Sequence, residues 1–143
     1  MNQLITELTF VNEQSIQIGL FLATMGTFLG GVWANESWGR YWGWDAKETW
    51  ALIIVMVYSI VAHLRLVPAL RSQLLFNISS ILAFSTVLMT FIGVNYYLSK
   101  GLHSYASDDK AVFPAEGWIA ILAVFGLIIW AIIKERRGAP ASE

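Results

Sequence analysis

Four long apolar stretches, separated by short polar connections, most constrain how this chain can fold. They predict helices over residues 15–33, 46–66, 74–98 and 115–133, each near the roughly 20 residues that an α-helix needs to cross a bilayer core. The chain is 57% hydrophobic and 13% charged, which is too apolar for a soluble domain of 143 residues. We therefore predict a single all-α, polytopic integral membrane domain over residues 1–143 with four transmembrane helices, in contact with membrane lipid.

Composition excludes several classes of function. The formal net charge is −1, so the chain has no basic field to attract nucleic acid. Cysteine is absent, which removes disulfides, cysteine-ligated zinc, iron–sulfur clusters and covalent haem attachment to this chain. No nucleophilic triad, phosphate-binding loop or carboxylate pair stands out among the polar residues.

Basic residues near the helix ends predict the orientation in the membrane. They lie in the connection 64–73 and at the C-terminal end: Arg65, Arg71, Lys134, Arg136 and Arg137. Cytoplasmic connections carry the excess of Lys and Arg, so both regions are expected on the cytoplasmic side. The connections 34–45 and 99–114 then face outward.

Two predicted helices carry a face of small or polar residues. The members of these two faces are Gly19, Ala23, Gly26 and Gly30 on the first helix, and Ser79, Thr86, Thr90 and Gly93 on the third. Such faces are typical of close helix–helix contacts in membranes, so both are expected to face other helices. Residues 1–14 are short and mixed, which fits an interfacial helix or the remnant of a preceding segment.

The connection between the first two helices concentrates aromatic residues. It and its borders hold five of the seven tryptophans: Trp33, Trp38, Trp42, Trp44 and Trp50. A belt at the headgroup level explains Trp33 and Trp50, which flank the two helices, but not the three between them. Together with Tyr41, these three predict an aromatic surface able to hold a large flat molecule.

The second helix begins with a capping signature. Asp45 precedes the apolar run and Glu48 follows three residues later, as in a capping box. Both carboxylates are therefore better explained as helix caps than as catalytic acids.

The chain has two histidines, and each allows two interpretations. His63 falls within the second helix near its cytoplasmic end, where it is either a functional residue or an interfacial side chain bonded to a carbonyl. His103 falls in the outer connection, where a solvated loop residue is the plain alternative. Beside an aromatic surface, an imidazole can serve as an axial ligand to haem iron. Arg40 and Lys47 could then pair with haem propionates, while a quinone or a lipid headgroup is the competing ligand.

Two motifs resemble a known family. The run Trp38-Gly-Arg-Tyr-Trp-Gly-Trp-Asp-Ala-Lys-Glu-Thr-Trp-Ala-Leu-Ile53 closely resembles the tryptophan-rich WWD signature of membrane haem-handling proteins in cytochrome c biogenesis. Its Lys-Glu-Thr-Trp-Ala-Leu continuation resembles the CcsA (ResC) type of the System II pathway more than the CcmC or CcmF branches. The run Asn95-Tyr-Tyr-Leu-Ser-Lys-Gly-Leu-His-Ser-Tyr105 resembles the second signature of that family.

The resemblance implies a function in cytochrome c maturation. Haem b, as a bound substrate, would be presented at the outer face of the bacterial inner (cytoplasmic) membrane for attachment to the Cys-x-x-Cys-His motif of apocytochrome c. A CcsB (ResB)-type protein would be the partner. Whether the chain is itself an enzyme is undecided; it would form part of a cytochrome c synthase (haem lyase) complex. The alternatives are a non-catalytic membrane subunit with a quinone or lipid site, and a haem exporter that serves a chaperone.

The resemblance also assigns residues. The predicted haem-contacting set combines the residues that the resemblance implies with Arg40, considered above. It is Trp38, Arg40, Trp42, Trp44, Asp45, His63 and His103. His103 would be the axial ligand to the haem iron, and His63 would serve haem entry or the stability of the external site. The chain departs from the family in having Ala46 where Pro is common, which suits a first helical turn equally.

A second departure concerns what the chain lacks. The family normally has several further helices before the tryptophan-rich segment, with a second external histidine, whereas this chain has no histidine before His63. It looks like the C-terminal part of a CcsA-type protein, so the other axial ligand is expected from missing N-terminal helices or a second chain.

Overall fold

The structure is a computed structural model that describes residues 2–98 and 114–138. The chain divides into two compact units, residues 1–110 and 111–143, which are considered one at a time. Every element of the described residues is helical, as predicted for an all-α protein. The prediction that residues 1–143 form one domain stays a prediction.

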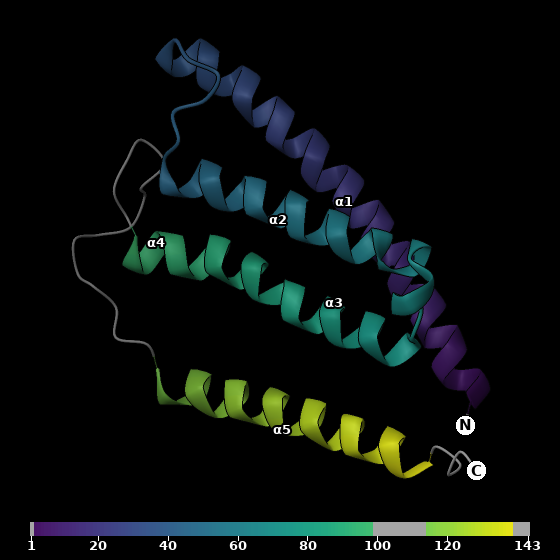
Figure 1. The fold of residues 1–143 in the computed structure, drawn as a ribbon. Helices are drawn as coiled ribbons and strands as arrows, with labels where there is room; N and C mark the ends of the chain where they lie inside the picture. The colour runs from purple at the N-terminus through teal and green to yellow at the C-terminus, as the bar shows by residue number, and fades with distance from the viewer. Residues whose placement is uncertain (1, 99–113, 139–143) are drawn as a thin grey trace. The chain divides into compact units, whose positions relative to one another are not determined.

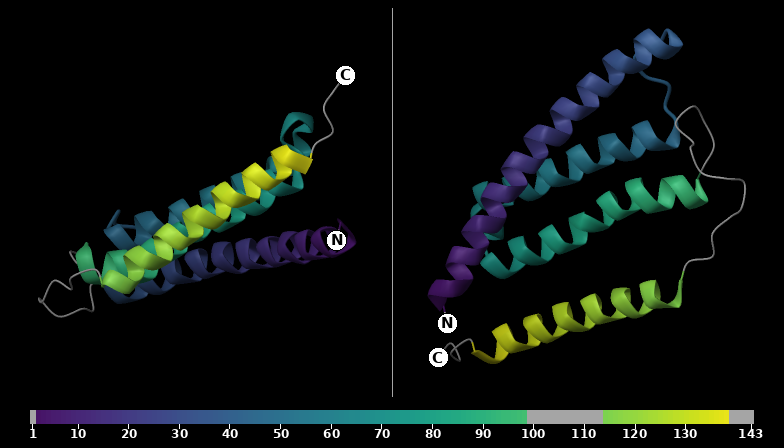
Figure 2. Two further views of the ribbon diagram at one scale, coloured as in Figure 1. Left: turned by 90° about the horizontal axis from the view of Figure 1, so that it is seen from below. Right: turned by 180° about the vertical axis from the view of Figure 1, so that it is seen from behind.

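The first unit contains three long helical segments (Figure 1). Its elements are α1 (Asn2–Trp38), α2 (Ala46–His63), the short 3-10 turns η1 (Leu64–Leu66) and η2 (Pro68–Leu70), α3 (Gln73–Leu88), the π-helical turn η3 (Met89–Gly93) and α4 (Val94–Tyr97). α2 and α3 lie side by side and antiparallel, and α1 crosses them obliquely, diverging from α2 toward Trp38 (Figures 1 and 2). Residues 39–45, here called the Trp loop, join α1 to α2.

The second unit contains one described helix, α5 (Ala115–Gly138). Its large apolar side chains are mostly exposed, and the Lys134 ammonium lies 4.9 Å from the centre of the Trp130 ring. The sequence predicted that this helix would end near residue 133. Instead, Lys134–Arg137 continue the helix, because Lys, Glu and Arg are good helix formers and no Pro or Gly stands between residue 133 and Gly138.

Four helical segments of the described residues are long and apolar enough to cross a membrane. They are Gln3–Trp38, Ala46–Leu66, Gln73–Tyr97 and Ala115–Arg137, which confirms the predicted number and the three later positions. Most large apolar side chains on them are exposed, a surface that is stable against lipid or other apolar helices but not against water. The chain is therefore an integral membrane protein.

The first predicted helix was wrong at both ends. α1 starts at Asn2 instead of residue 15, because nothing between them breaks a helix, and it ends at Trp38 instead of residue 33. Gly39 stops it with a left-handed backbone (φ 72°), which glycine adopts without strain. The 37 residues of α1 make it about 55 Å long, so it is tilted or extends beyond a bilayer core of about 30 Å.

Polar side chains fasten the N-terminal half of α1 to α3. The Asn12 amide donates to Asn77 Oδ1 (3.0 Å) and to Ser80 Oγ (3.1 Å), while Asn77 donates to Thr9 Oγ1 (2.8 Å). Just beside them, Phe76 is fully buried at the centre of the apolar core. In an apolar environment, such interhelical bonds leave no unpaired polar group and fix the register of the two helices.

The structure confirms one of the two predicted helix-contact faces but not the other. On α3 and η3, Thr90 and Gly93 are buried and Ser79 and Thr86 are half-buried, so this face points inward as expected. On α1, no atom of another element lies within 4 Å of where a Cβ would stand on Gly19, Gly26 or Gly30. Within the described residues no helix packs against that face, which instead lines a groove.

Candidate functional site

A groove of about 420 Å³ lies beneath the Trp loop. The diverging end of α1 forms one wall, and the start of α2 with η3 forms the other. Its lining includes Gly26, Gly30, Tyr41, Trp42, Lys47, Glu48 and Phe91. Glycines leave part of the α1 wall without side chains, and Trp33 adds an aromatic ring to that wall. Tyr41 and Trp42 come from the Trp loop, and the charged Lys47 and Glu48 come from α2.

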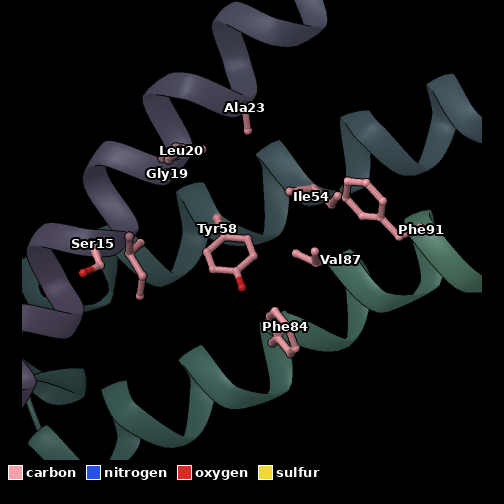
Figure 3. A pocket seen from close by; sticks show the side chains of 10 residues that line it. Ser15, Gly19, Leu20, Ala23, Ile54, Tyr58, Phe84, Val87 and Phe91 are labelled. Carbon is pink, nitrogen blue, oxygen red and sulfur yellow. The ribbon is translucent and has the colours of Figure 1, made fainter.

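A second apolar groove of about 360 Å³ continues the first toward the middle of the helices (Figure 3). The two share Ala23, Ile54 and Phe91, so they adjoin one another along α2. Tyr58 of α2 lies in its middle, with its hydroxyl directed toward Phe84 of α3 (Figure 3). The combined space is long and mostly apolar, and its charged end is at the Trp loop.

Helix caps at both ends shape the Trp loop. The Gly39 amide donates to the Asn35 carbonyl (2.8 Å) and closes α1. Asp45 caps α2 as predicted, since its Oδ1 accepts from the Glu48 amide (2.9 Å). Glu48 Oε2 accepts from the Gly43 amide (2.6 Å), so this carboxylate ties down the loop.

The tryptophans form two edge-to-face pairs. Trp33 and Trp38 lie at the end of α1 with ring centroids 5.0 Å apart, and Trp42 and Trp44 lie in the Trp loop with centroids 5.7 Å apart. Trp44 is 70% exposed and has a left-handed backbone (φ 57°), whereas Trp42 is half-buried in the groove wall. The buried Nε1 of Trp42 has no hydrogen-bond partner among the described residues, so it can donate to a bound molecule.

Two cations lie near the groove. The Arg40 guanidinium covers Gly43 so closely that a Cβ at residue 43 would lie 2.5 Å from its Cζ, which requires glycine there unless Arg40 moves. Lys47 donates to Asn95 Oδ1 (3.2 Å), and its side chain lines the groove. Arg40 is exposed and belongs to the Trp loop, while Lys47 belongs to the first turn of α2.

The structure does not bring His63 to the groove. It ends α2, about 27 Å from Asp45 at 1.5 Å per residue. Its Nδ1 donates to the Ser59 carbonyl (2.7 Å), as in the interfacial interpretation, which leaves Nε2 as the ring atom that faces outward. His103 lies outside the described residues, which contain no cluster of metal-ligating side chains.

Comparison with known proteins decides the family. The sequence model of the cytochrome C assembly protein family matches residues 1–103. The chain belongs to this family. Protein NrfI of Wolinella succinogenes is 51% identical over 105 residues, and the proteins named cytochrome c biogenesis protein CcsA of Marchantia polymorpha and Cuscuta reflexa are 46% and 45% identical over 103 and 105 residues. These matches cover 72–73% of this chain but only 12% of the first relative and 32–33% of the other two.

Membership in the cytochrome c assembly family agrees with the resemblance carried by the two motifs. The sequence did not single out Gly31 and Phe91, which line the groove, or Asn95, which bonds to Lys47. Thr90 was expected to face inward, and it lines the groove as well. No pattern in the sequence marks the π-turn that brings Phe91 and Asn95 to this place. The polar bonds of Asn12 were missed because residues 1–14 were not recognised as part of the first helix.

Proposed function

We propose that this protein binds haem in the groove beneath the Trp loop and presents it at the outer face of the membrane for attachment to apocytochrome c. Haem is a substrate here. The observation that carries the proposal is an aromatic groove, with Tyr41 and Trp42 in its wall and Lys47 at its charged end, in a member of a cytochrome c assembly family.

The groove has the properties that a porphyrin requires. Its volume lies within the range of about 300–1,000 Å³ typical of ligand sites. Its apolar walls suit a flat macrocycle, and the unpartnered Trp42 Nε1 offers a donor inside it. Arg40 and Lys47 can pair with carboxylates, so the propionates would lie toward the Trp loop.

The residues take different roles in this proposal. Trp38, Trp42 and Trp44 supply aromatic surface, while Asp45 acts indirectly by capping α2 and thereby holding the Trp loop. His103 is proposed as the axial ligand to the haem iron. The described residues offer no imidazole at the groove, so the other axial ligand is proposed to come from further helices or a second chain.

We further propose that the Trp loop and His103 face the outside of a bacterial inner (cytoplasmic) membrane, with the C-terminus cytoplasmic. Arg65 and Arg71 in the connection between α2 and α3 support this orientation, as do the basic residues that end α5. The proposed partners are apocytochrome c and a CcsB (ResB)-type protein, with which the chain would act in a cytochrome c synthase complex.

The test is a haem stain of c-type cytochromes from cells that lack the protein, with the wild-type gene or a variant supplied in trans. We expect no mature c-type cytochromes without the protein and strongly reduced amounts with Trp42→Ala. Phe28→Ala is the matched control, because Phe28 is a 71% exposed aromatic residue on α1 outside the groove. Normal c-type cytochromes in the deletion strain would contradict the proposal and favour a quinone or lipid site. Haem accumulating on a soluble carrier would instead favour an exporter.

A further inference from the structure

Asn95 connects three elements around the groove. Its side-chain Oδ1 accepts from Lys47 Nζ of α2 (3.2 Å), and its Nδ2 donates to the Phe91 carbonyl of η3 (2.7 Å). Lys47 and Phe91 both line the groove beneath the Trp loop. Because both ends of the amide are engaged, its orientation is fixed, and the oxygen is the end that faces the lysine.

The π-turn is what directs Asn95 toward Lys47. The Val94 amide bonds to the Met89 carbonyl and the Leu98 amide to the Gly93 carbonyl, each five residues back. Thr90 is buried on the groove side, and Asn95 follows it by five residues. In an unbroken α-helix these two residues would point about 140° apart, whereas a π-turn places them on nearly the same side.

The start of α2 places opposite charges in the same wall of the groove. Lys47 and Glu48 are adjacent in the chain, and both line the groove. The Glu48 carboxylate is held at the Gly43 amide (2.6 Å), so its negative charge stays at the Trp loop. Whether an anionic group that enters the groove meets attraction or repulsion therefore depends on where the Lys47 ammonium is held.

We propose that Asn95 is a positioning residue that holds the Lys47 ammonium where it meets a carboxylate of the bound tetrapyrrole. This inference rests on the proposed haem-binding function and deepens it, because it names the part of the substrate that this end of the groove recognises. Lys47 contacts the substrate, and Asn95 acts through Lys47. The π-turn is the structural element that makes this arrangement possible.

The experiment compares two ligands that differ only in charge. Haem and its dimethyl ester, in which both propionates are uncharged, are titrated into the purified protein in lipid nanodiscs. Asn95→Leu keeps the approximate shape of the side chain but removes both hydrogen bonds. We expect haem affinity to fall about tenfold and the ester affinity to change less than about twofold, since a hydrogen bond to a charged group is typically lost at that cost. Retained ester binding also shows that the variant is folded.

Lys47→Met provides the second arm. It is expected to give the same selective loss for haem, and adding Asn95→Leu to it is expected to cause no further loss, because the two residues act as one unit. An equal loss for both ligands in Asn95→Leu would assign Asn95 a merely structural role and overturn the proposal. An unchanged haem affinity would overturn it as well. Wild-type protein that binds neither ligand would overturn the proposed haem function itself. This result differs from the two results above, which overturn only the role of Asn95.

Discussion

Trp44 has an unusual backbone for a large residue. Its φ of 57° is left-handed, which costs a non-glycine residue roughly 1–2 kcal/mol. Its ring packs edge-to-face against Trp42, and Asp45, the N-cap of α2, follows it directly in the chain. The result is an indole that is 70% exposed at the surface of the Trp loop. Strained residues of this kind concentrate at binding sites.

Replacing Trp44 separates backbone strain from ring function. Trp44→Gly is expected to be about 1 kcal/mol more stable to unfolding than Trp44→Ala, because glycine adopts positive φ without penalty. Both variants are expected to bind haem less tightly than the wild type, since neither has the ring. Unfolding by denaturant in mixed micelles measures the first effect and haem titration the second. Equal stabilities would refute the strain, and wild-type affinity in either variant would exclude Trp44 from the site.

Trp42 has a buried donor without a partner among the described residues. Trp42→Phe keeps an aromatic ring but removes that donor, whose burial without a bond costs roughly 1–3 kcal/mol. The ligand-free variant is therefore expected to unfold within about 1 kcal/mol of the wild type, since this relief offsets the smaller ring. Haem affinity is expected to fall about tenfold if Nε1 donates to the ligand. Unchanged affinity in a haem titration would show that the ring alone matters.

At the scale of elements, the two halves of α1 have different surroundings. Its N-terminal half bonds to α3 through Thr9 and Asn12, whereas its glycine face borders the groove without a helix against it. This uneven attachment lets α1 diverge from α2 and leaves space below the Trp loop (Figure 1).

The α1–α3 attachment can be measured by a double-mutant cycle. Asn12→Leu and Asn77→Leu are each expected to lower the free energy of unfolding by about 1 kcal/mol, in the range of interhelical bonds in membranes. Because the two amides share a bond of 3.0 Å, the effects should not add. Gln17→Leu, an exposed position on the same helix, is the control and should change little. Additive effects in micelle unfolding would contradict the direct coupling.

Sequence patterns predicted some elements better than others. Hydropathy located the spans that begin at Ala46, Gln73 and Ala115, because twenty apolar residues have few alternatives to a membrane helix. The aromatic run was misjudged between Trp33 and Trp38, where the helix continues to the first residue able to end it, Gly39. A π-turn adds one residue to a turn without changing composition, so η3 had no signal in the sequence.

The candidate site, like the helices, was predicted only where the signal is local in the sequence. Local signals placed Asp45 correctly, since a cap depends on residues within one turn. The bond between Lys47 and Asn95 joins positions 48 residues apart, and only the packing of α4 on α2 reveals it. The predicted ligand role of His103 lies outside the described residues and stays a prediction.

At the scale of the whole molecule, His63 and the groove lie at opposite ends of α2. His63→Ala is expected to lower haem occupancy, because the resemblance implies that His63 serves haem entry or the stability of the external site. It is not expected to alter the Soret maximum of the haem that remains, because an imidazole about 27 Å away cannot ligate the same iron. Haem content and absorption spectra of the purified variant measure both quantities. A shifted Soret maximum would show that His63 reaches the iron, and unchanged occupancy would leave it an interfacial residue bonded to Ser59.

The chain spans about a third of the length of the CcsA proteins that it matches, and the other axial ligand of the proposed haem site is proposed to come from outside it. The proposal that the groove and His103 form one side of that site is tested most directly by the Soret spectrum of the purified protein. We predict that wild-type protein retains haem, that Trp42→Ala lowers its amount and that His103→Ala shifts or abolishes the band. A wild-type protein without haem, or spectra and haem content unchanged in both variants, would contradict it.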